Sequence, residues 1–181
     1  MPVKKILAGV LVGVYCFLAP NGWAVTLQPM SLAELVQEAD IIFVGTAVTR
    51  VSAWNPEHTR IYTRTTFQLE EYLKGYAGET IVVETMGGVA EGVGMMVPGM
   101  PVFSVNQQEL LFVTTGRRTG THHVLGWVQG RFQIRKDPKT GRETVSRNLA
   151  GVSIVGARTS KVESIQYLDE LKEAIHRLKG K

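Results

Sequence analysis

The stretch "SLAELVQEADIIFVGTAVTRV" (residues 31–51) joins a short helical pattern directly to an apolar strand pattern. Ser31 and Glu34 form a capping box, in which the hydroxyl and the carboxylate satisfy free amide groups of the first helical turn. Residues 41–48 are rich in β-branched side chains, which is typical of a strand. The helix is only about two turns long and is unstable alone. We therefore expect it to dock on a sheet and to close one end of a barrel.

Strand patterns recur along the chain at 61–73, 80–85, 110–115 and 121–136, the last of them interrupted. "DPKTG" (137–141) then indicates a turn, because its proline fixes one φ and its glycine permits a positive φ. Residues 143–147 are the expected return arm. Short strands with glycine-rich turns favour a small barrel or sandwich. We predict a mainly β (α+β) fold: a five-stranded OB-like β-barrel with a short N-terminal helix and an amphipathic C-terminal helix.

The last helix is predicted over 160–179. Ser160 and Glu163 repeat the capping box. Apolar residues then recur every three or four positions, at Val162, Ile165, Leu168, Leu171, Ile175 and Leu178. Charged residues fill the opposite face of the helix. We expect the apolar face to pack on the barrel, and a helix that binds a partner is the alternative interpretation.

The N-terminus has the pattern of a secretory signal peptide. Lys4 and Lys5 precede an uncharged apolar run at 6–19, and small residues stand at Gly22 and Ala24. The run is shorter than the roughly 20 residues that a membrane-spanning helix needs. We therefore expect a signal peptide at 1–24 and an exported protein, periplasmic or secreted, with no transmembrane span after cleavage. The remaining residues, 25–181, are expected to form one domain.

Cysteine content and charge change when this segment is removed. The single cysteine, Cys16, lies in the predicted signal, so the exported domain has no disulfide and depends on its core for stability. The signal also carries two lysines and no acidic residue, so the net charge falls from +4 to +2. Acidic residues concentrate before position 110, and basic residues concentrate at 117–158. This asymmetry indicates either cross-strand ion pairs or a site for an acidic partner. Export and the near-neutral charge disfavour nucleic acid as a partner.

The glycine-rich stretch "MGGVAEGVGMMVPGMP" (86–101) is the most unusual segment. Glycine loops that hold phosphate lead into a helix N-terminus, and Val97-Pro98-Gly99 excludes one here. Its methionines are adaptable side chains that form a binding patch where they are exposed and a core where they are buried. Trp54 and Trp127 are either stacking platforms or residues of the core or rim. The binding residues that we predict are Trp54, Gly87, Gly88, Met95, Met96 and Met100.

The sequence predicts no catalytic residue, no metal ligand and no cofactor. His122 and His123 are adjacent, so on a regular strand they point to opposite faces and cannot easily share a metal ion. The exported domain lacks cysteine, and the chain has no G-x-S-x-G pattern. The alternative is an enzyme whose site is assembled from distant residues, with His58 or His122 beside an acid such as Glu91 or Glu109.

Four segments, in this order, resemble a group of exported bacterial proteins of uncharacterised function: "LAELVQEADIIFVGTAV" (32–48), "YLKGYAGETIVVETMGG" (72–88), "VPGMPVFSVNQQELLFV" (97–113) and "VLGWVQGRFQI" (124–134). "EADIIFVGTAV" is also similar to the start of netrin-like domains, the OB barrels of tissue inhibitors of metalloproteinases. That resemblance implies a protease inhibitor or an interaction module. Those inhibitors chelate the protease zinc through an N-terminal cysteine and are held by disulfides. The chain here is expected to begin at Val25 without any cysteine, so the chelating mechanism does not carry over.

The expected function is an exported, non-enzymatic binding module whose partner is an exported or envelope protein. Inhibition of a protease is one form that such binding takes. The contact surface is expected at the loop 87–100, with Trp54 near the barrel rim. The alternatives are the enzyme described above and an envelope structural protein that self-associates through edge strands or the last helix.

Overall fold

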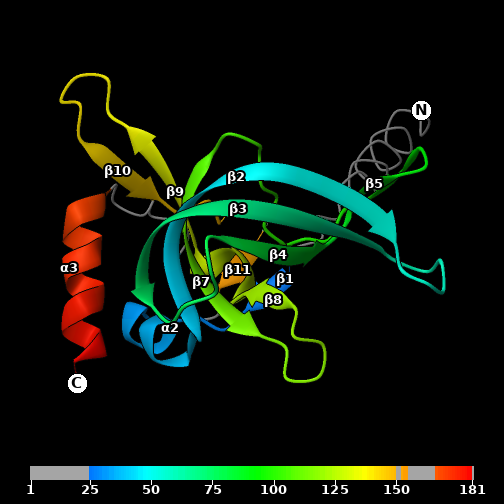
Figure 1. Cartoon of the computed structure of the whole chain (residues 1–181), viewed down its shortest axis with the longest axis horizontal. Helices are drawn as coiled ribbons and strands as arrows, with labels where there is room; N and C mark the ends of the chain where they lie inside the picture. Colours follow the sequence, from blue (N-terminus) through cyan, green and yellow to red (C-terminus); the bar gives the residue numbers. More distant parts are fainter. Residues whose placement is uncertain (1–24, 150–151, 155–165, 181) are drawn as a thin grey trace, which may run out of the picture.

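The computed structural model describes residues 25–149, 152–154 and 166–180. Along the chain these residues form β1 (Val25–Leu27), α2 (Leu32–Glu38), β2 (Ile41–Trp54), β3 (Ile61–Lys74), β4 (Thr80–Met86), β5 (Gly88–Ala90), β6 (Val93–Met95), β7 (Gln108–Thr115), β8 (His122–Val124), the 3₁₀ turn η2 (Trp127–Gly130), β9 (Arg131–Lys136), β10 (Glu143–Ser146), β11 (Val152–Ile154), β12 (Gln166–Tyr167) and α3 (Leu168–Lys179) (Figure 1). The predicted signal peptide lies outside the described residues. Neither described helix has the length and apolar character that crossing a membrane requires.

Five strands close into a barrel, in the order β2, β3, β4, β8, β7 and back to β2. All neighbouring strands are antiparallel except β4 and β8, which run parallel. A three-stranded meander whose open side is closed by two later strands is an OB-like barrel. The predicted fold class is therefore confirmed. Beyond the barrel, the sheet continues from β7 through β9 and β10 to β12.

The central strands are buried on both faces. Phe43 of β2 belongs to a cluster that draws on all five barrel strands and fills the barrel. Its neighbours Ile42 and Val44 belong to a second cluster on the outside of the barrel wall. Strands that are covered on both faces read as continuous apolar runs. This explains the runs "IIFV" (41–44) and "LLFV" (110–113).

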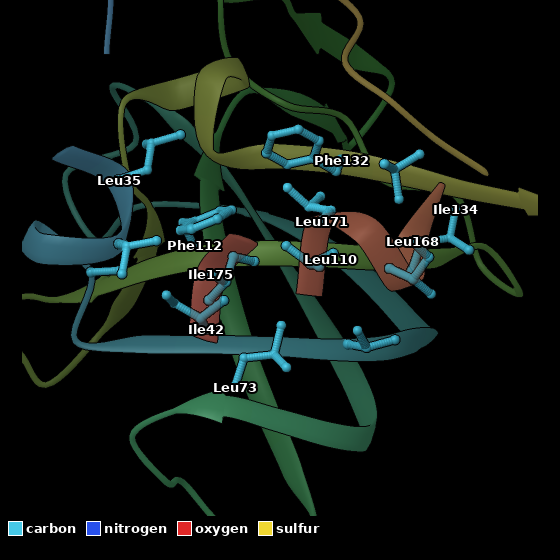
Figure 2. Packing of buried hydrophobic residues seen from close by; sticks show 14 residues of the cluster. Leu35, Ile42, Leu73, Leu110, Phe112, Phe132, Ile134, Leu168, Leu171 and Ile175 are labelled. Carbon is cyan, nitrogen blue, oxygen red and sulfur yellow. The ribbon is translucent and has the colours of Figure 1, made fainter. Parts of the chain in front are cut away.

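Helix α2 packs against the outer face of the barrel. The predicted capping box is present, because Ser31 Oγ accepts from the Glu34 amide at 3.2 Å and the Glu34 carboxylate accepts from the Ser31 amide at 2.7 Å. Leu35 and Val36 lie in the outer cluster, together with residues of β7 and α3 (Figure 2). The expectation that this helix closes one end of the barrel is wrong, because its apolar side faces the outside of the wall.

Helix α3 begins at Leu168 rather than at Ser160 as predicted. The preceding residues Gln166–Tyr167 are extended, because they form β12 and pair with β10. The predicted capping box at 160 and 163 lies outside the described part of the chain. The predicted apolar face is confirmed from Leu168 onward, since Leu168, Leu171 and Ile175 are buried in the outer cluster. In Figure 1 this helix stands at the end of the molecule opposite to β5.

Candidate functional site

A groove with a cavity volume of about 660 Å³ lies where the barrel interior meets the hairpin β5–β6. The hairpin and residues 96–103 form its walls, and Thr63 of β3 and Thr85 of β4 contribute hydroxyls from the barrel. Phe103 lines the groove and also belongs to the cluster inside the barrel. Mostly apolar cavities of about 300–1,000 Å³ are typical of binding sites. This groove is therefore the candidate functional site.

Close contacts to β2 and β3 hold the hairpin in place. Gly88 has φ 131°, and a Cβ at this position would lie 2.3 Å from Thr63 Oγ1 and 2.4 Å from Ser52 Oγ, so only glycine fits here. The Thr63 hydroxyl donates to the Gly87 carbonyl at 2.6 Å. The Gly87 amide in turn donates to the Ile61 carbonyl at 2.7 Å. These contacts fix where the hairpin crosses the barrel, and so they fix the shape of the groove.

Most of the predicted binding residues meet at this groove. Its lining includes Gly87, Gly88, Met95, Met96 and Met100. Met96 is 92% exposed, so this methionine is on the surface rather than in a core. Trp54 does not line the groove. Its ring stacks on His58, with ring centroids 4.5 Å apart, and its Nε1 is buried without a hydrogen-bond partner among the described residues.

Sequence reasoning missed several residues of the groove: Arg50, Thr63, Thr85 and Phe103. Residues at every second position of a strand point to the same side, so Thr63 shares the inward side of β3 with Phe67. The sequence therefore did contain a signal for Thr63. Arg50 has no such signal. The register of β2 against β3 shifts between Ala47 and Thr49, and a shift of this kind reverses which residues face inward.

A smaller hollow of about 310 Å³ adjoins the groove and shares Met100 with it. Its other lining residues include Glu84, His123 and Trp127. His123 Nδ1 lies 3.2 Å from the Glu84 carbonyl oxygen. Trp127 has φ 60° and packs against Gly99 in the wall of the groove. The two hollows therefore lie next to each other and share part of their lining.

A buried ion pair lies behind the groove wall. Glu109 is fully buried and accepts from Arg131 Nη2 at 2.6 Å and from Arg131 Nε at 3.2 Å. Burial raises the pKa of Glu109, and the two hydrogen bonds from Arg131 oppose that rise. The guanidinium also lies 5.0 Å from the ring centroid of Phe103. Because both carboxylate oxygens are occupied, Glu109 supports the wall and is a poor candidate for a catalytic acid.

His58 and His122 lie away from the groove. His58 Nε2 is 3.5 Å from Glu91 Oε2, but the two side chains are 62% and 71% exposed. His122 Nδ1 is 3.1 Å from Thr115 Oγ1. Burial lowers the pKa of His122, electrostatic repulsion by the neighbouring His123 ring adds to this, and Asp40 opposes it. Neither His58 nor His122 lines the groove or the hollow beside it, so neither stands where a substrate would be held.

The groove offers apolar contacts, hydroxyls and a guanidinium, a set of groups suited to binding. In the part of the chain that the structure describes, no three potential metal-ligating side chains come together. Neither the protein-family models nor the curated proteins contain a match to this chain.

Proposed function

We propose that this protein is a non-enzymatic binding module that holds an apolar segment of an exported or envelope protein in the groove. The observation that carries the proposal is the apolar rim of the groove. Met96, Val89 and Val102 all line it and are 92%, 65% and 62% exposed. Exposed apolar side chains that gather around a recess are typical of interaction sites.

The composition of the walls also supports a protein partner. Four methionines line the groove, and methionine side chains adapt their shape to different apolar surfaces. The signal pattern at 1–24 supports export, so the partner is an exported or envelope protein. Inhibition of a protease is one form of this function. It would use the groove, because the chain lacks the N-terminal cysteine with which the netrin-like inhibitors bind zinc.

A variant that fills the groove tests the proposal. A Cβ on Gly94 would meet no atom within 4 Å, and Gly94 lines the groove, so Gly94→Leu fills the groove without disturbing its walls. Thr49→Leu is the matched control, because it adds an exposed leucine to β2 outside the groove. Wild type and both variants serve as bait for the exported proteins of the source organism. Each captured partner is then purified and titrated by calorimetry.

Wild type and Thr49→Leu should bind the partner equally, and Gly94→Leu should bind at least about tenfold more weakly, a loss of about 1.4 kcal/mol. Equal binding by all three proteins would place the contact outside the groove and contradict the proposal. Circular dichroism of each variant confirms that the fold is intact before the comparison is made.

A further inference from the structure

The groove carries an uncompensated positive charge. Arg50 is the only charged residue among the described residues that line it. Nothing in the described part of the chain forms an ion pair or a side-chain hydrogen bond with Arg50. The other lining residues are apolar residues, glycines, prolines and two threonines. A guanidinium beside an apolar recess is complementary to an apolar ligand that carries one negative charge.

The barrel itself directs Arg50 toward the groove. Beyond the register shift in β2, Arg50 pairs with Thr65 and Ser52 pairs with Thr63. Cross-strand partners lie on the same face of a sheet. Thr63 lines the groove, and the hydroxyl of Ser52 lies 2.8 Å from that of Thr63. Arg50 is therefore on the face of β2 that turns toward the groove.

The main chain at the groove favours a peptide over a lipid chain. In the described residues β6 pairs with β5 only, so its other edge has no strand beside it. Gly94, which lines the groove, is the middle residue of β6, so no side chain covers the main chain of the strand at that position. A free strand edge binds an extended peptide through main-chain hydrogen bonds. An alkyl chain offers no donor or acceptor to these groups.

We propose that the groove receives the carboxyl terminus of the partner polypeptide. The last apolar side chains of the partner lie against the methionines and Phe103, and its main chain follows β6. Its terminal carboxylate accepts hydrogen bonds from the guanidinium of Arg50. This inference rests on the proposed function and names the part of the partner that is recognised.

Paired peptide pools test the inference on the full protein. The first probe is a fluorescein-labelled hexapeptide pool with Val, Ile, Leu or Phe at its last positions and a free carboxylate. The second probe is the same pool with an amidated C-terminus. Dodecanoate, which represents a lipid source of the same charge, is titrated separately by calorimetry. Binding is measured by fluorescence anisotropy for wild type, Arg50→Gln and Arg60→Gln. Arg60 is the matched control, because it is an exposed arginine immediately before β3 that does not line the groove.

The free-acid pool should bind wild type and Arg60→Gln equally, and Arg50→Gln should weaken that binding roughly tenfold to hundredfold. Amidation should weaken binding to wild type by a similar factor and should have little effect on Arg50→Gln. Equal binding of the acid and amide pools to wild type would overturn the inference. It would leave the proposed binding of an apolar segment in the groove unaffected. Binding of dodecanoate without binding of either pool would overturn it in favour of a lipid anion. Failure of all probes would also overturn it, and the Gly94→Leu comparison would still decide the proposed function.

Discussion

Replacing Glu109 by leucine should destabilise the fold by about 3–5 kcal/mol, because it leaves the guanidinium of Arg131 buried without its counter-ion. The side chain of Glu109 is fully buried, and that of Arg131 is only 11% exposed. Two hydrogen bonds, at 2.6 and 3.2 Å, join them. Each hydrogen bond to a charged group contributes about 1.5–3 kcal/mol, so the loss of both is consistent with the expected range.

The double variant Glu109→Leu with Arg131→Met should recover most of this loss. It removes both charges, so neither remains desolvated without a partner, and the new side chains fill a similar volume. Its free energy of unfolding should lie within about 1 kcal/mol of wild type or above it. Urea unfolding, followed by tryptophan fluorescence, measures wild type, both single variants and the double variant.

The ion pair between Arg177 and Glu173 is the control for this cycle. Its Nη1–Oε2 distance is 3.7 Å, and the two side chains are 71% and 73% exposed. Arg177→Met should therefore cost less than about 1 kcal/mol. The reasoning is refuted if Glu109→Leu loses less than about 1 kcal/mol, or if the double variant is as unstable as Glu109→Leu.

Three further substitutions test other parts of the structure. Gly88→Ala should lower the free energy of unfolding by about 1–3 kcal/mol and weaken binding in the groove, because the added Cβ would lie 2.3 Å from Thr63 Oγ1. An unchanged urea unfolding curve would contradict this. Thr65→Val should raise the free energy of unfolding by about 1 kcal/mol in the same assay, because the buried Thr65 hydroxyl has no hydrogen-bond partner among the described residues. A lower free energy of unfolding would show that the hydroxyl does have a partner. Burial lowers the pKa of His122 in the folded state. The contribution of His122 to the free energy of unfolding is therefore complete above its ordinary pKa, and it is lost as the pH falls through the lowered pKa. Wild type should therefore lose more stability than His122→Asn between about pH 7.5 and pH 5, and parallel curves would refute this.

The barrel was predictable from the sequence because its strands leave strong local signals. The apolar runs at 41–44 and 110–113 mark strands that are covered on both faces, and alternation along 61–73 marks β3. The capping box at Ser31 is a local interaction, so its two residues identify it without tertiary information. The start of α3 was not predictable, since the helical spacing of apolar residues says nothing about the pairing of β12 with β10.

The groove was predictable only in part. The methionines and glycines stood out by composition, and the structure places them in its lining. Arg50 did not stand out, because simple alternation from Phe43 and Ala47 leaves it on the outer face. The register shift before Thr49 reverses that pattern, and it depends on how two strands meet. Trp54 was expected at the contact surface as a stacking platform near the barrel rim, but its ring stacks on His58 outside the groove lining.

The methionines allow a direct test of the claim that the groove is the binding site. Four of the six methionines, Met86, Met95, Met96 and Met100, line the groove. Met30 instead packs against the outer cluster beside α2 and serves as an internal control. The measurement is an NMR titration of the protein, labelled at its methionine methyl groups, with the captured partner or with the free-acid peptide pool. We predict shifts at the groove methionines, largest at Met95 and Met96, and none at Met30. A change in the chemical shift of Met30, with unchanged chemical shifts at the four groove methionines, would contradict the claim that the groove is the binding site.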